Sequence, residues 1–299
     1  MDLNKYAKQA GQKVLVFGEP KSGKTASVGK LAKYFKLLWI DLENGTLTLV
    51  NHLTEEEKKN VTIARIPDTL QNPIAIKIVD AIFRGTKLTV CDEHGLDNCK
   101  TCREKGAPVV EFDVDKLDNS WVVVIDSLTQ LSASALNYAT RDIADLDKIE
   151  FKHYDQQGFY LSRILTNIQQ AKYNVCVITH EAALTGADKE ELIRPVGGTK
   201  NFSKLLSKHF DHVVYTEVKN LKHVSASGTD YRNNIITGSR TSVSLEKGKS
   251  ADQSQLALLF FSAIPEAERP AEINEIFKEL ESQQSAPSTA GKPQLLLKR

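Results

Sequence analysis

Residues 18–25 read GEPKSGKT and carry the strongest chemical signal in the sequence. They match the pattern G-x-x-x-x-G-K-[ST] without a substitution. In such a loop the glycines let backbone N–H groups close around a phosphate, the lysine contacts phosphate oxygens, and the last hydroxyl holds Mg²⁺. We therefore predict a phosphate-binding loop. The nucleotide-contacting residues would be Gly18, Glu19, Pro20, Lys21, Ser22, Gly23, Lys24, Thr25 and Ala26.

The segments on both sides of this loop have the patterns that such a site needs. Residues 13–17 form a short apolar run, which predicts a buried strand. After the loop, apolar residues recur at i, i+3, i+4 and i+7, which predicts a helix with one buried face. These residues are Val28, Leu31, Ala32 and Phe35. A chance glycine-rich turn, the alternative interpretation, would not require a strand before it and a helix after it.

Strand-like and helical segments alternate along most of the chain. The apolar runs that predict strands are 13–17, 37–41, 61–66, 121–125 and 174–179, and helical patterns fall between them. This alternation predicts an α/β fold with a mainly parallel central sheet. Strand-like segments between 211 and 261 favour an antiparallel extension, and a last helix is expected near 270–281.

Two acidic residues follow predicted strands. Asp126 ends an apolar run, where a carboxylate can hold the water shell of Mg²⁺, although Asp126 or Ser127 could equally cap the next helix. Glu43 lies just past the strand that follows the loop helix, where a carboxylate can polarise a water aimed at a γ-phosphate. On spacing alone, Glu43 could equally be a solvent-exposed loop residue.

The four motifs occur in a recognisable order. After the phosphate loop come WIDLEN at 39–44, VVVIDS at 122–127 and CVITHE at 176–181. In this order they resemble RecA-like P-loop ATPases, and more closely the small phage-encoded ATPases grouped as AAA-type nucleotide-binding proteins, some of which promote annealing of single strands. The resemblance covers roughly residues 12–262.

This resemblance implies roles for particular residues. Glu43 would be the catalytic base, with Lys24 and Mg²⁺, held by Thr25 and Asp126, offsetting phosphate charge. His180 would sense the γ-phosphate, in a position where RecA itself has Gln. The segment 182–200 would be a mobile DNA-binding loop. Ring or filament assembly would bring a cation from a neighbouring subunit, for which Arg240, Lys219 and Lys222 are candidates, although a solvated cation at a strand end is the simpler interpretation of each.

Basic residues in and after this segment could contact single-stranded DNA. They are Arg194, Lys200, Lys204 and Lys208. A helix over 201–209 would place the three lysines on one stripe, at a spacing of four residues, where they could follow a phosphate backbone. The alternative is a solvated face opposite Phe202, Leu205 and Leu206. No aromatic residue lies between 182 and 200, so this segment offers no ring for stacking on a base.

Three of the four cysteines lie together. Cys91-x2-His94-x4-Cys99-x2-Cys102 offers four soft ligands at spacings that suit a closed, tetrahedral Zn²⁺ site. The alternatives are a redox dithiol and unrelated free thiols. The cluster lies in a polar insertion at about 86–112, for which we expect bound metal to supply folding energy. Cys176 lies in a predicted buried strand and is expected in the core.

The composition excludes several classes of protein. Lys and Arg number 39 and Asp and Glu 38, so any polyanion must meet a local patch of charge. No apolar run is long enough to cross a membrane, and the first residues lack a signal region. We expect a cytoplasmic protein, in the host cytoplasm if it is phage-encoded. Residues 1–281 would form one ATPase domain, and 282–299 a disordered tail that could bind a protein partner.

Together these observations predict a Mg²⁺-dependent ATPase coupled to single-stranded DNA binding in recombination, annealing or repair. A second hypothesis is a nucleotide-gated scaffold that binds a replication partner without DNA affinity. A third, a small-molecule kinase, is disfavoured by Glu43, because a kinase works best without an activated water.

Overall fold

The computed structural model describes residues 10–143, 148–185, 191–219, 222–226, 235, 237–240 and 253–285 of the 299. The chain divides into two compact units, Met1–Ala263 and Ile264–Arg299. The expected division at 281/282 between a domain and a tail stays a prediction. Within the described residues, no helix combines the length and the apolar character needed to cross a membrane.

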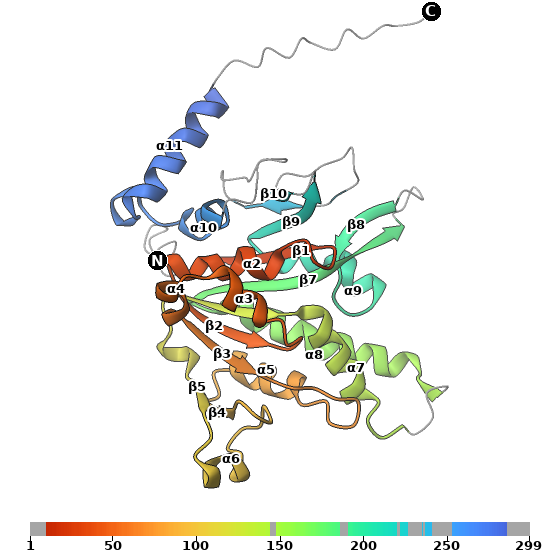
Figure 1. Cartoon of the computed structure of the whole chain (residues 1–299). Coiled ribbons are helices and arrows are strands. Elements are labelled where there is room, and N and C mark those ends of the chain that lie inside the picture. Colours follow the sequence, from red (N-terminus) through yellow and green to blue (C-terminus); the bar gives the residue numbers. More distant parts are fainter. Residues whose placement is uncertain are drawn as a thin grey trace, which may run out of the picture. The chain divides into compact units, whose positions relative to one another are not determined.

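A central sheet dominates the first unit (Figure 1). Six strands run parallel in the order β9 (His212–Lys219), β1 (Lys13–Gly18), β7 (Asn174–Thr185), β6 (Trp121–Asp126), β2 (Lys36–Asp41) and β3 (Val61–Arg65). Three antiparallel strands extend it: β10 (Lys222–Ala226) and β11 (Gly238–Ser239) pair with β9, and β8 (Glu191–Pro195) pairs with β7. The predicted α/β class with a mainly parallel sheet is confirmed.

Helices cover both faces of this sheet because its strands are apolar on both sides (Figure 1). One group packs together and consists of α5 (Ala75–Phe83), α7 (Leu128–Ala139) and α8 (Phe151–Gln170). The other contains α2 (Lys24–Gly29), the 3₁₀ turn η1 (Lys30–Lys33), α3 (Leu47–His52), α4 (Glu55–Lys59) and α10 (Gln253–Phe261). Val123 and Ile125 of β6 pack in the core shared with the first group.

The cysteine-bearing insertion forms its own small hairpin. Strand β4 (Leu88–Cys91) pairs antiparallel with β5 (Val109–Phe112). In the sequence, helix α6 (Lys100–Lys105) comes between the two strands, and the turn η2 (Val114–Lys116) follows β5. We expected a polar insertion, and for its base that was wrong. Leu88, Val90 and Phe112 are buried in the main core, so the base of the hairpin is held by ordinary burial.

Four expected elements differ in the structure. Strand β9, expected in the antiparallel extension, pairs parallel with β1, and only β10 and β11 are antiparallel to it. Residues 253–261, expected as strand, form helix α10, because a continuous apolar run has no periodicity that separates helix from strand. The expected loop after His180 begins as strand, since β7 continues to Thr185 and pairs with β8. The expected helix over 201–209 is split into α9 (Lys200–Leu205) and the 3₁₀ turn η4 (Leu206–His209).

The second unit contains the turn η5 (Glu266–Glu268) and helix α11 (Ala271–Ser285). The guanidinium of Arg269 lies 4.2 Å from the ring centre of Phe277, and Lys278 pairs with Glu266 at 3.2 Å. The helix extends to Ser285 and so includes the first residues of the segment that we expected to be disordered. The rest of that segment lies outside the described residues, and its binding of a protein partner stays a prediction.

Candidate nucleotide site and cysteine cluster

The phosphate loop needs glycine at two positions. Gly18 ends β1 with φ +154°, and a Cβ there would lie 2.1 Å from the carbonyl oxygen of Thr216 on β9. Gly23 has φ 89° at the N-cap of α2, in the left-handed region that other residues rarely adopt. The neighbouring strand and the turn into the helix therefore both exclude larger side chains. The remaining loop residues connect β1 to α2, as the sequence predicts.

Lys24 is held inside the loop. Its Nζ donates hydrogen bonds to the carbonyl oxygens of Gly18 at 2.9 Å and Glu19 at 2.6 Å. Burial lowers the pKa of Lys24, and the nearby carboxylates of Asp126 and Glu43 partly oppose this shift. The ammonium thus lies where the loop would surround a phosphate, and phosphate oxygens could take over the positions of these carbonyl acceptors.

Two carboxylates from neighbouring strands lie beside the loop. Asp41 and Asp126 are paired in the parallel register of β2 and β6, and the Thr25 hydroxyl donates to Asp126 Oδ2 at 3.1 Å. Burial, with Glu43 and Asp41 nearby, raises the pKa of Asp126 to about 7. Asp41 Oδ2 is buried and has no hydrogen-bond partner among the described residues. This excess of acceptors and negative charge fits a hydrated Mg²⁺.

Glu43 lies next to this pair, with its backbone N–H donating to Asp41 Oδ1 at 3.1 Å, and its carboxylate lies between two other polar side chains. The Ser127 hydroxyl donates a hydrogen bond to Glu43 Oε1 and also accepts one from the backbone N–H of Gln130, so it caps helix α7. The Nε2 of His180 lies 3.6 Å from the same Glu43 oxygen. Sequence reasoning placed Glu43 and His180 at this site but missed Asp41 and the contact of Ser127 with Glu43.

These residues line one cavity of about 600 Å³. Its walls include the loop residues Pro20, Lys21 and Gly23 to Ser27, together with Glu43, Asp126, Ser127 and His180. Helix α3 adds Thr48 and His52, which the sequence gave no reason to include. The volume is within the range of small-molecule sites, and the lining combines a cation, acids and backbone N–H groups at a helix N-terminus, which suits a nucleotide phosphate chain.

Comparison with known families agrees with this geometry. The sequence model of a family described as AAA domain matches residues 10–243, most of the chain. The chain belongs to the AAA domain family. It is a P-loop ATPase, as predicted, and the AAA family model supports nucleotide binding. The link to phage proteins stays a prediction.

Two further comparisons add less. A search of curated proteins finds no match. Among solved structures, this AAA domain protein is similar to a prototypical ATPase from the type III secretion system of pathogenic bacteria, with 10% sequence identity and a TM-score of 0.40. The similarity covers 69% of this chain and 52% of that one, so the chain spans about half the length of that protein.

Helix α7 connects the nucleotide pocket to the segment after His180. The hydroxyls of Thr129 and Thr179 lie 2.9 Å apart, and the backbone N–H of His180 donates to Thr129 Oγ1 at 3.1 Å. One turn further along, Ser132 Oγ accepts from the backbone N–H of Gly198 at 2.8 Å. The start of α7 therefore contacts both the pocket wall and the connection between β8 and α9.

The predicted DNA-contacting residues lie in and after this connection. Lys200, Lys204 and Lys208 are all exposed, but the break between α9 and η4 prevents one continuous helical stripe. Leu205, expected to pack inward, is 59% exposed. The Arg194 guanidinium donates to the carbonyl oxygen of Lys204 at 3.4 Å, which ties β8 to α9. Their roles in DNA binding stay predictions.

The candidate trans-acting cations lie at two different ends of the sheet. Arg240 follows β11, beside the start of β9, and pairs with Asp211 at 3.1 Å, at the end opposite the phosphate loop. Lys219 and Lys222 face each other in the register of β9 and β10, beyond the point where Thr216 is level with Gly18. The latter two are thus nearer the loop end of the strands.

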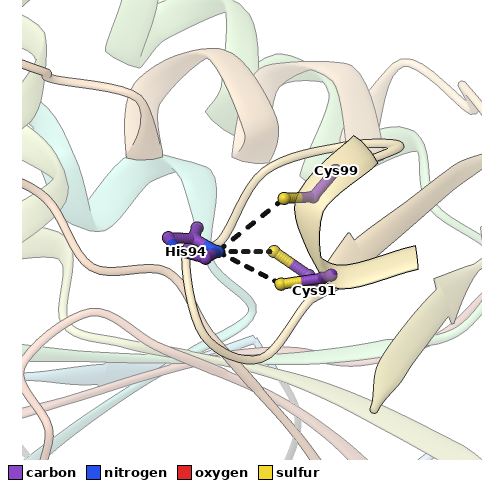
Figure 2. Close-up of side chains that lie close together, drawn as sticks. Cys91, His94 and Cys99 are labelled. Atoms are coloured by element: carbon purple, nitrogen blue, oxygen red, sulfur yellow. Dashed lines mark hydrogen bonds between the residues drawn. The ribbon is translucent and has the colours of Figure 1, made fainter. Parts of the chain in front are cut away.

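The cysteine cluster is compact (Figure 2). One ligand atom each from Cys91, His94, Cys99 and Cys102 lies within 4.8 Å of all the others. The Nδ1 of His94 is 3.1 Å from the Sγ of Cys102, 3.7 Å from that of Cys99 and 4.0 Å from that of Cys91. Ligands around tetrahedral zinc are separated by about 3.5–3.8 Å, as bond lengths of about 2.0–2.3 Å require.

The chain folds locally to produce this cluster. Cys91 ends β4, Cys99 is the N-cap of α6, and Cys102 lies in its first turn. Gly95 has φ +62° and packs against Ile66, where a Cβ would approach the Ile66 Cα to 2.8 Å. The turn that carries His94 is therefore fixed against the core. Cys176 is fully buried in β7, as expected, away from this set.

Proposed function

We propose that this chain binds Mg·ATP in the described cavity, hydrolyses it, and couples the hydrolysis to binding of single-stranded DNA in recombination or annealing. The observation that supports hydrolysis most directly is the position of Glu43. It shares a pocket with Lys24 and is contacted by Ser127, with His180 Nε2 at 3.6 Å. A carboxylate placed in this way can orient a water for in-line attack on a γ-phosphate.

The residues of the chain divide the chemical work. Backbone N–H groups of the loop and Lys24 would bind the β- and γ-phosphates, and Thr25 with Asp126, assisted by Asp41, would hold Mg²⁺. When bound, Mg²⁺ offsets charge on the phosphates. Glu43 would take its position for water once it leaves the Ser127 hydroxyl, and His180 would contact the γ-phosphate. The AAA domain assignment supports the nucleotide part of this proposal.

The proposal also includes one structural Zn²⁺ at the cysteine cluster. The donor set is three thiols and one imidazole, all from protein, which leaves no position for a substrate. The ion would hold the tip of the hairpin, whose base is already buried in the core. A redox dithiol is less well supported because the histidine lies among the three sulfurs.

Steady-state ATPase rates with and without single-stranded DNA test the proposed function. Glu43→Gln should retain nucleotide affinity and lower kcat by at least about 100-fold, the usual contribution of a general base. Lys24→Ala should abolish tight nucleotide binding. Glu56→Gln removes an exposed carboxylate from α4 and should change neither property. Wild-type turnover in Glu43→Gln would show that the base is misassigned.

The ATPase rates, together with DNA affinity measured at several salt concentrations, separate the DNA-coupled enzyme from the scaffold hypothesis. We expect DNA to raise the wild-type rate, and we expect binding to weaken with salt because it depends on local phosphate contacts. The salt slope is the slope of the logarithm of the DNA-binding constant against the logarithm of the salt concentration. Replacing Lys200, Lys204 and Lys208 together with Ala should reduce its magnitude by about 2, since each phosphate contact on a single strand contributes about 0.7. Absence of DNA affinity at low salt in every nucleotide state would favour the scaffold.

A further inference from the structure

Helices α5, α7 and α8 pack against one another (Figure 1). Residues in and next to these helices line a second hollow, which shares no residue with the nucleotide pocket. It has a volume of about 410 Å³. Its lining mixes aromatic rings and basic side chains over a small apolar floor: Ile76, Lys77, Asp80, Ala81, Arg84, Tyr138, Tyr160 and Arg163. None of these residues takes part in the nucleotide site.

The rings form a connected group. Tyr138 and Tyr160 meet edge to face with their centres 5.4 Å apart, and Phe159 meets Tyr160 with centres 6.0 Å apart. Phe159 is 62% exposed, and both tyrosines are partly exposed. Exposed aromatic side chains that are already in contact with one another can stack a further planar group at little extra cost in side-chain entropy.

Cations lie against the same rings. The Arg141 guanidinium is 4.1 Å and the Lys77 ammonium 5.4 Å from the ring centre of Tyr138. The Arg163 guanidinium is 5.4 Å from the centres of both Phe159 and Tyr160. These six residues, Lys77, Tyr138, Arg141, Phe159, Tyr160 and Arg163, are called the stacking surface below.

Two acids oppose these cations without cancelling them. Asp80 is 3% exposed and accepts two hydrogen bonds of 2.7 Å from Arg163, and it also pairs with Arg84 at 3.0 Å. Asp142 lies 3.6 Å from Arg141 and is exposed. Among the described side chains in these contacts, four are basic (Lys77, Arg84, Arg141 and Arg163) and two are acidic, which leaves an excess of positive charge. Because Asp80 is buried, it fixes the plane of Arg163 from below rather than facing a ligand.

We infer that the stacking surface binds single-stranded nucleic acid, with bases on its rings and phosphates on its cations. Rings next to cations are the arrangement by which proteins bind single strands without sequence preference. The segment 182–208 supplies lysines, but residues 182–200 contain no aromatic side chain. The inference rests on the proposed DNA coupling and gives it the base-stacking contacts that residues 182–200 lack.

Anisotropy of a labelled oligothymidylate, compared with an abasic strand of equal length, tests this inference. Phe159→Ala should weaken binding of the oligothymidylate about tenfold and leave the abasic strand unaffected, because only the former has bases to stack. Lys77→Gln with Arg141→Gln should weaken both strands and reduce the salt slope by about 1.4, for two phosphate contacts. The basal ATPase rate should stay at the wild-type value.

Matched controls are available in the chain. Phe151→Ala removes a ring that is 90% exposed from the same helix, and no cation lies over it among the described residues. Lys58→Gln with Lys59→Gln removes equal charge from α4. Neither control should change binding of either strand.

The outcomes separate this inference from the proposed function. If the wild type binds oligothymidylate and Phe159→Ala binds it equally well, the stacking surface is refuted while DNA coupling stands. If labelled polyglutamate binds as tightly as the oligothymidylate and competes with it, the surface recognises acidic protein and the inference fails. If the wild type binds no strand, both DNA claims fail, and the Glu43→Gln result still decides whether the chain is an ATPase.

Discussion

At the scale of single residues, His212 shows how burial couples stability to pH. Its imidazole is fully buried at the start of β9, with Nε2 3.2 Å from Gln12 Oε1 and Nδ1 2.8 Å from Ser239 Oγ. Because the amide oxygen can only accept, Nε2 carries the proton and Nδ1 accepts from the serine hydroxyl. A neutral imidazole therefore satisfies both partners, and burial lowers the pKa of His212 to about 4, with Asp211 opposing the shift.

This arrangement predicts acid sensitivity. Between the unfolded pKa of about 6.5 and the folded value, the unfolded chain takes up a proton at His212 and the folded chain does not, so stability falls as pH falls. From about pH 7.5 to about pH 4.5 the loss is roughly 2.5 kcal/mol. Urea unfolding at both pH values measures the free energy of unfolding and should show this loss in the wild type. In His212→Gln the loss between the two pH values should be smaller by the same amount. An equal loss of unfolding free energy in both proteins would contradict the lowered pKa of His212.

The residues of the nucleotide site differ in how far sequence could identify them. Lys24 and Thr25 belong to a fixed motif, and Asp126 and Glu43 each follow a strand, so spacing alone brings them to one edge of a parallel sheet. Asp41 has the same signal as Asp126, a carboxylate at the end of a buried strand, and could have been found in that way. The contact between Ser127 and Glu43 joins residues far apart in sequence, so only the fold reveals it.

At the scale of elements, the errors have a common physical cause. Apolar runs were recognised as buried, but burial alone does not determine whether a run forms a helix or a strand, or which element it packs against. Residues 253–261 pack as a helix against η1, and Phe260 and Phe261 contact the ring of Phe35, which lies just after that turn. The segment after His180 pairs with β8, and no local sequence pattern predicts this pairing. Strands β1, β2, β6 and β7 were predictable because each contains a short apolar run that is buried on both faces.

The cysteine hairpin is the element whose tip we expect bound metal to stabilise. We expect one zinc per chain by elemental analysis, and protection of Cys91, Cys99 and Cys102 from a thiol reagent until a chelator is added. Cys176 should stay unreactive in both states because burial raises its pKa and blocks access. Chelation should loosen only the tip, since Leu88, Val90 and Phe112 hold the base.

Hydrogen exchange and a matched variant make this test specific. Amides between 91 and 107 should exchange faster after chelation, while those of β4 and β5 next to the core and those of β6 stay protected. Cys99→Ser should reproduce the chelated state. A metal-free protein with a protected tip and reactive thiols would rule out the zinc site.

At the scale of the whole molecule, helix α7 links the proposed sites. Its first turn contacts Glu43 through Ser127 and the backbone of His180 through Thr129. Ser132 reaches Gly198, ahead of the lysines of α9, and Tyr138 near the C-terminal end belongs to the stacking surface. A single helix thus contacts the part of the pocket formed by Glu43 and His180 and both surfaces at which we expect DNA. Movement of Glu43 from Ser127 toward a bound water would change the first of these contacts.

This connection predicts coupling that must be equal in both directions. If the ATP-bound state favours the arrangement that binds DNA, a non-hydrolysable ATP analogue should tighten DNA binding at least about fivefold relative to ADP. Saturating single-stranded DNA must then tighten binding of the analogue, relative to ADP, by the same factor, because linkage makes the two effects equal. Anisotropy of labelled DNA measures the first factor and calorimetry of the nucleotide the second. Thr129→Val, which removes the acceptor for the His180 N–H, should reduce both factors together. Equal DNA affinity with ATP analogue, ADP and no nucleotide would show that hydrolysis and DNA binding are independent in this chain.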